Sequence, residues 1–184
     1  MSAIVYLLQT FLGLLLSVFL LRVLLPLARA DARNPFSLAV IRLTNPLVLP
    51  LRRIFPPIGR LDTAALIALM VMQLAATALL LIVSSHILNG TIVFITAAFD
   101  LIELVLQFYK WATILFVLLS WVAPDTYSPV SGILNSLVAP LVRPWRKLIP
   151  PFGGMDFSPA LLVIAIQALI LLLDEARKHW TFFF

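Results

Sequence analysis

The sequence lacks cysteine altogether and has only two histidines among its 184 residues. Disulfides, thiolate nucleophiles and cysteine-ligated metal sites are therefore excluded, and a histidine-based metal or haem site has little support. Charged residues are also scarce, at 11% against roughly 25% in an average soluble domain. A soluble fold needs polar side chains to cover its core. A chain with a mean hydropathy of +1.10 is therefore expected to lie in a lipid bilayer.

Four apolar stretches are long enough to cross a membrane as helices, which takes about 20 residues for roughly 30 Å of hydrocarbon. They run over approximately residues 5–28, 64–88, 94–122 and 159–173. The fourth stretch is short and needs neighbouring residues to complete the crossing. The sequence thus predicts an all-α membrane protein with four transmembrane helices.

The positions of lysine and arginine predict the orientation, because basic residues in short loops stay on the cytoplasmic side. The loop after the first span contains six arginines, the loop after the third contains three basic residues, and the connection at 86–91 contains none. We therefore expect both basic loops in the cytoplasm and both termini outside, with Arg177 and Lys178 in mild conflict. The net charge of +5 then faces lipid headgroups, and no nucleic acid is expected as a direct partner.

The two halves of the chain match without a gap when they are shifted by 94 positions. Matched prolines, glycines and charges carry more weight than leucines in so apolar a chain. They include Asp31 with Asp125, Pro35 with Pro129, Pro46 with Pro140, Pro50 with Pro144, Arg52 with Arg146, and Gln73 with Gln167. The sequence predicts two tandem repeats, 1–90 and 91–184, each a helix, a basic interfacial segment and a helix. Both repeats cross in the same direction, which disfavours an inverted-repeat transporter.

The basic loops are unusual because apolar residues dominate them while arginines interrupt them. Such a segment is expected to lie on the membrane as an amphipathic element. Pro46 and Pro50 argue against one continuous helix, so we expect short interfacial pieces. The candidate lipid- or partner-binding residues are Arg52, Arg53, Arg143, Trp145, Arg146 and Lys147. Binding to anionic headgroups and docking of an acidic cytoplasmic partner both fit this composition.

Each basic segment ends in a repeated motif, Pro-Pro-x-Gly-x-x-Asp. Its residues are Pro56, Pro57, Gly59 and Asp62 in the first copy, and Pro150, Pro151, Gly153 and Asp156 in the second. The prolines stiffen the chain and the glycine permits a tight turn. Asp62 directly precedes the second span, where it is expected either to cap the helix or to pair with a loop arginine. Asp156 precedes a better cap, Ser158 with Pro159, which favours the ion pair.

Polar residues within the spans are costly and are therefore candidates for function. The third span carries a polar stripe at positions i, i+3, i+7 and i+10, made of Asp100, Glu103, Gln107 and Lys110. This polar stripe either lines an ion or proton path or lies at the outer rim and the bundle interface. Gln73 and Gln167 are expected to bond to each other or to backbone. Arg22 is expected to extend towards the cytoplasmic interface.

No arrangement typical of an enzyme is found in the sequence. It contains no nucleophile–base pair, no glycine-rich phosphate loop and no cluster with metal-ligand spacing. We therefore expect neither catalysis nor a cofactor, and an enzyme acting on lipid is the least favoured class.

Sequence elements of the duplicated pattern also resemble a known family. They are Asn34-Pro35, Asn45-Pro46-Leu47, Pro50-Leu51-Arg52-Arg53, and the two Pro-Pro-x-Gly-x-x-Asp motifs that end at Asp62 and Asp156. Over nearly the whole chain this pattern resembles the YggT family in its two-repeat proteobacterial form, although Ala139 replaces Asn45 in the second copy. The resemblance implies a bacterial inner-membrane protein with chloroplast relatives. It also implies links to cell division, osmotic tolerance or cofactor assembly on cytochrome b, and supplies no catalytic residues.

We therefore predict a non-enzymatic inner-membrane scaffold or assembly factor that presents basic loops to the cytoplasm. Its expected partners are anionic membrane lipids, an unidentified membrane or cytoplasmic protein, and a second copy of the chain. The alternative is an ion-transporting, channel-like protein that uses the polar stripe and contributes to osmotic tolerance.

Overall fold

The computed structural model describes residues 3–85, 89–122, 128–147 and 156–182. In these ranges it has six helices: α1 (Ala3–Leu27), α2 (Pro35–Arg52), α3 (Thr63–Ser85), α4 (Gly90–Val122), α5 (Pro129–Arg146) and α6 (Ser158–Phe182). Four of them, α1, α3, α4 and α6, are long and apolar enough to cross a membrane. The predicted all-α membrane fold with four spans is thus confirmed.

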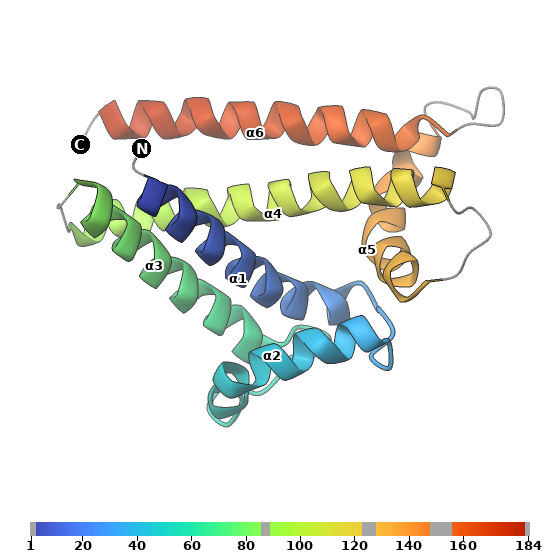
Figure 1. Ribbon diagram of the computed structural model, residues 1–184, viewed down its shortest axis with the longest axis horizontal. Helices are drawn as coiled ribbons and strands as arrows, with labels where there is room; N and C mark the ends of the chain where they lie inside the picture. The colour runs from blue at the N-terminus through green and yellow to red at the C-terminus, as the bar shows by residue number, and fades with distance from the viewer. Residues whose placement is uncertain (1–2, 86–88, 123–127, 148–155, 183–184) are drawn as a thin grey trace.

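The four spans pack as two pairs, with α1 against α3 and α4 against α6 (Figure 1). The shorter helices α2 and α5 lie across one end of the bundle, and the N- and C-terminal ends of the chain lie at the other (Figure 1). Helix α2 contacts α1 and α3, and α5 contacts α4 and α6. The order of two long helices with a shorter one between them therefore occurs twice.

The prediction of short interfacial pieces is wrong, because α2 and α5 are each one continuous helix with two prolines inside. Pro46 and Pro50 are four residues apart and share the exposed face of α2, as Pro140 and Pro144 do in α5. Each proline leaves one carbonyl without its helical donor. On the exposed face those carbonyls can bond to water or headgroups, so the helices continue.

The N-termini of the two short helices are capped and joined to each other. Asn34 Oδ1 accepts a bond from the Phe36 N–H at 2.9 Å, and Ser128 caps α5 by bonding reciprocally with Ser131. Asn34 Nδ2 also donates to the Pro129 carbonyl at 2.7 Å. Asn34 is buried, so one side chain both caps α2 and ties it to the start of α5.

Two apolar clusters form the interior of the bundle. One contains residues of α1, α2 and α3, and the other is formed mainly by α4, α5 and α6, with Leu25 and Val40 joining it from the first half. Val48 of α2 and Val142 of α5 are both fully buried and are 94 positions apart in the chain. The short helices thus insert their inner faces between the spans instead of resting on their ends.

The fourth span is longer than the sequence indicates, because α6 continues through Asp174, Glu175 and Arg177 to Phe182. Polar residues end a hydropathy-based span, but they do not end a helix that still has neighbours to pack against. The extension places Arg177 beside α4, where it finds carboxylate partners.

We predict that Asn34→Ala lowers the free energy of unfolding by about 2 kcal/mol, since it removes both a helix cap and the bond to α5. Asn34→Ser keeps a capping oxygen and loses only the bond to Pro129, so it should cost about 1 kcal/mol. Unfolding in mixed micelles measures both variants. No loss in Asn34→Ser would show that the bond between α2 and α5 contributes nothing.

Candidate functional site

The segment between α2 and α3 reverses the chain and brings Asp62 back to the end of α2. Ile58 and Leu61 exchange two backbone hydrogen bonds of 3.0 Å, and Gly59 between them has φ +59°, a conformation that favours glycine. Thr63 Oγ1 donates to the Pro56 carbonyl at 2.7 Å and fastens the base of the turn. The Pro-Pro-x-Gly element is therefore a positioning turn for the aspartate that follows it.

Asp62 is both a helix cap and an ion-pair partner, so the two sequence interpretations hold together. Its Oδ1 accepts a bond from the Ala65 N–H at 3.3 Å at the start of α3. Its Oδ2 pairs with Arg52 and lies 3.5 Å from Arg22 Nε. One carboxylate at the start of α3 thus binds the end of α2 and the end of α1.

Arg22 does not extend to the membrane surface as expected, but is buried within this cluster. Its side chain is 7% exposed and that of Asp62 is 5% exposed, whereas Arg52 is 38% exposed. No local pattern in the sequence indicates this pair, because 40 positions separate its members. The position matching Arg22 in the predicted second repeat is Phe116, and within the described ranges Arg22 is the only buried arginine.

The corresponding pair in the second half lies closer to the surface. Arg146 Nε donates to Asp156 Oδ2 at 2.7 Å, with side chains 50% and 31% exposed. Asp156 Oδ1 also accepts a bond from the Ser158 N–H, so the aspartate caps α6 in place of the serine expected there. Partial burial alone would raise the pKa of the Asp156 carboxyl, but hydrogen bonds from Ser158 and Arg146 outweigh it and lower the pKa. Pro150, Pro151 and Gly153 lie outside the described residues.

The six basic-loop candidates divide into two groups. Arg52 and Arg146 are used in the ion pairs, and Trp145 is half-buried against the apolar cluster of α4, α5 and α6. The remaining three are exposed and have no ion-pair partner within the part of the chain that the structure describes: Arg53, Arg143 and Lys147. The charges of this second group are therefore not neutralised by an ion pair among the described residues.

The two carboxylates of the polar stripe, Asp100 and Glu103, take part in contacts between spans. Arg177 of α6 pairs with Asp100 at 2.7 Å and with Glu103 at 3.1 Å. Asp100 also accepts a bond from Thr77 of α3, which in turn accepts one from Gln73. Arg177 was not predicted as their partner, although two carboxylates in the first half of one span and an arginine near the end of an antiparallel span are a usable signal.

The other two residues of the polar stripe, Gln107 and Lys110, lie in different environments. Lys110 Nζ donates to Gln167 Oε1 at 3.3 Å and lies 5.5 Å from the centre of the Trp111 ring. Gln73 and Gln167 therefore do not bond to each other. Instead, each bonds to a polar side chain: Gln73 to Thr77 on its own helix, Gln167 to Lys110 on α4. Gln107 lies at a cavity between α1, α4 and α5.

Within the described residues no group of three or more histidine, cysteine, aspartate or glutamate side chains is placed to hold a metal ion. The polar side chains of α3, α4 and α6 form a network that crosses from helix to helix at Thr77–Asp100, Arg177–Asp100 and Arg177–Glu103. This arrangement holds the three helices together.

Four spans with two capped helices across one end define a multi-pass helical membrane protein. The chain belongs to the CCB3/YggT family, whose model matches residues 1–83 and 95–176. It is 38% identical over 173 residues to a Pseudomonas aeruginosa protein, covering 93% of this chain and 88% of the relative. It is 32% identical over 169 residues to YggT of Escherichia coli K12, covering 92% and 88%. A Vibrio alginolyticus relative is 32% identical over 172 residues, covering 91% of each chain. No solved structure matches.

We predict that Asp62→Asn destabilises the protein by about 3–5 kcal/mol, because it leaves the buried Arg22 without a counter-charge. Asp156→Asn is the matched substitution at an exposed pair and should cost below about 1 kcal/mol. Thermal or denaturant unfolding of the two variants in the same detergent measures the difference. Similar losses at both positions would contradict the structural role of the buried cluster.

Proposed function

We propose that this protein is a non-enzymatic scaffold or assembly factor of the bacterial inner membrane. In this proposal α2 and α5 lie at the cytoplasmic surface, both termini lie outside, and the exposed basic residues meet a partner protein together with anionic lipid. Such a role fits cell division, envelope organisation or the assembly of membrane complexes. The bacterial relatives and the position of the basic residues in the chain support this localisation.

The observation that carries the proposal is the fixing of α2 at both of its ends. Asn34 ties its start to α5, and the ion pair of Arg52 with Asp62 ties its end to α3. A helix that only associates with the lipid surface does not need contacts that fix both of its ends to the bundle. Fixed ends give the outer face a defined position, which is what recognition of a partner requires.

The outer surface of α2 has two distinct faces besides the one that packs on the bundle. Phe36, Leu43 and Leu47 are exposed and form one apolar stripe, since they are seven and four residues apart. Arg42 and Arg53 are exposed and eleven residues apart, so they share another face three turns along. An apolar stripe beside a basic face is typical of a helix at a membrane interface, with its arginines at headgroup level.

Site-specific photo-crosslinking in cells tests this proposal. A photoreactive residue at Ile54, which is exposed beside Arg53, should give a discrete protein adduct, and one at the exposed Leu171 of α6 should not. Adding Arg42→Glu and Arg53→Glu should abolish the adduct, because the acidic partner is then repelled. The charge-preserving pair Arg42→Lys and Arg53→Lys should retain it.

Two results would contradict the scaffold function. One is labelling from Ile54 that consists of lipid alone. The other is an adduct that persists when the charges are reversed. In a strain that depends on this gene, the reversed variant must also fail to complement while it accumulates in the membrane at a normal level.

Ion transport is the second candidate, and the polar network of α3, α4 and α6 is the observation in its favour. Five polar side chains there bond in sequence from Gln73 to Glu103 within the spans. If this network is a transport path, Asp100→Asn should abolish flux of K⁺, Na⁺ or H⁺ into liposomes. If it is a packing contact, the wild-type protein should give no flux above protein-free liposomes.

A further inference from the structure

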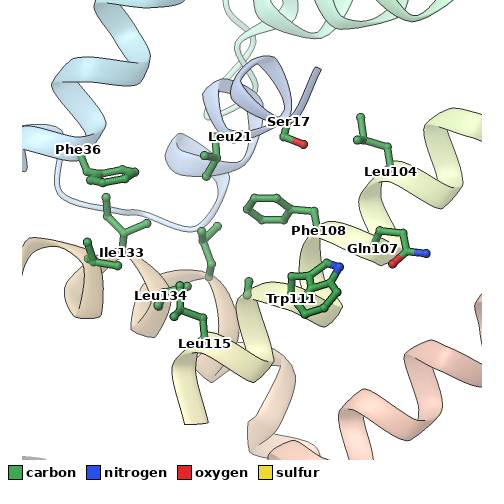
Figure 2. Close-up of a pocket in the computed structure, with 13 residues that line it drawn as sticks. Ser17, Leu21, Phe36, Leu104, Gln107, Phe108, Trp111, Leu115, Ile133 and Leu134 are labelled. Carbon is green, nitrogen blue, oxygen red and sulfur yellow. The ribbon is translucent and has the colours of Figure 1, made fainter. Parts of the chain in front are cut away.

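A cavity of about 350 Å³ lies where the two halves of the bundle meet. Its walls come from α1 and α4, and its floor comes from the starts of α2 and α5. Figure 2 shows the Phe108 ring and the side chains of Leu21, Ile133 and Leu134 turned towards a common space. This volume is within the range of roughly 300–1,000 Å³ that is usual for ligand sites.

Both halves of the chain line the cavity, and some of the lining residues occupy matching positions of the predicted repeat. Three pairs of its lining residues are 94 positions apart: Ser17 with Trp111, Leu21 with Leu115, and Phe36 with Val130. Equivalent surfaces of two parallel units face each other there, and small residues such as Ser17 do not fill the space between them. The cavity is therefore a consequence of how the two units meet.

The lining is suited to hydrocarbon and contains no ionisable side chain. Ser17 Oγ donates to the Gly13 carbonyl at 2.8 Å, so its hydroxyl is already satisfied. The Gln107 amide points away from the common space in the view of Figure 2. A charged or strongly polar ligand inside would lose its hydration without finding a partner, whereas a hydrocarbon chain would gain dispersion contacts.

The cavity opens sideways into the membrane. Trp111 and Leu115 line it and are exposed on α4, which is one of the four spans. At roughly 30 Å³ for each water-sized group, the volume corresponds to about a dozen methylene-sized groups. A lipid acyl chain has the right chemistry, size and access to enter from the bilayer.

Two arginines mark where the headgroup of such a lipid would lie. Arg29 and Arg33 belong to the segment between α1 and α2, are exposed, and have no ion-pair partner among the described residues. The same segment leads to Asn34, which is bonded to the start of α5, and to Phe36 in the cavity lining. Their positive charges complement a phosphate at the α2–α5 end of the bundle.

We infer that this cavity binds one acyl chain of an anionic phospholipid, whose phosphate group is held by Arg29 and Arg33. The lipid comes from the leaflet that faces α2 and α5. Its acyl chain fills the space between the two halves. The halves are therefore joined through the lipid at the cavity, where their side chains do not touch each other.

Native mass spectrometry of the full-length protein in a mild detergent tests this inference. The wild-type protein should retain one phospholipid per chain, enriched in phosphatidylglycerol or cardiolipin over phosphatidylethanolamine. Ser17→Phe fills the cavity and should reduce the retained lipid several-fold. Ser120→Phe is the matched control, because Ser120 is an exposed serine of α4 that also bonds to its own helix and lies outside the cavity.

The headgroup contact has its own variants. Arg29→Gln with Arg33→Gln should leave lipid bound but remove the preference for anionic headgroups. Arg60→Gln removes an exposed charge between α2 and α3, outside the segment that carries Arg29 and Arg33, and should keep the preference.

A second measurement uses the wild-type protein, so it does not depend on whether Ser17→Phe folds. A phosphatidylglycerol with a diazirine in its acyl chain should label the α5 peptide at Leu134 and Leu137, which are 7% and 3% exposed and line the cavity. The inference would be overturned if the protein retained no phospholipid or retained a neutral isoprenoid lipid instead. It would also be overturned if Ser17→Phe retained as much lipid as the wild type, or if labelling were confined to outward-facing residues.

Discussion

The structure depends first on the carboxylate of Asp62, which holds together the ends of three helices at one edge of the bundle. Its two oxygens have different partners: Oδ1 caps α3, and Oδ2 pairs with Arg22 and Arg52. An arginine buried in a membrane protein is costly without a counter-charge, so the position of α1 is tied to that of Asp62. Because Arg52 ends α2, the same carboxylate also sets the orientation of the surface helix.

The two halves use related interactions to different extents. In the second half, Arg146 and Asp156 repeat the bond between the short helix and the following span, but at an exposed site and without a buried arginine. The second half is tied to the first through Asn34, through shared apolar residues such as Leu25 and Val40, and around the cavity. The first half thus contains a buried ion pair, whereas the two halves meet through hydrogen bonds of Asn34 and Thr77 and through apolar residues around the cavity.

Sequence reasoning was accurate where a property depends on residues close together in the chain. Four spans followed from long apolar runs, and the turn at Gly59 followed from its neighbours. It failed for Pro46 and Pro50. A proline leaves the carbonyl four residues before it without a donor, and the helix can continue where that carbonyl faces water or headgroups. Sequence reasoning also missed the partners of Asp100 and Glu103, since Arg177 is more than 70 positions away and beyond the expected end of its span.

The sequence by itself determined that this chain is a helical membrane protein with two basic surface segments, because hydropathy and charge are summed over neighbouring residues. Only the tertiary structure decided which basic residues are available. Arg52 and Arg146 form ion pairs with the aspartates that follow them ten positions later, whereas Arg53, Arg143 and Lys147 are exposed and form no ion pair among the described residues. Adjacent residues such as Arg52 and Arg53 look alike in sequence. They differ because successive positions on a helix point about 100° apart, one to the bundle and one away from it.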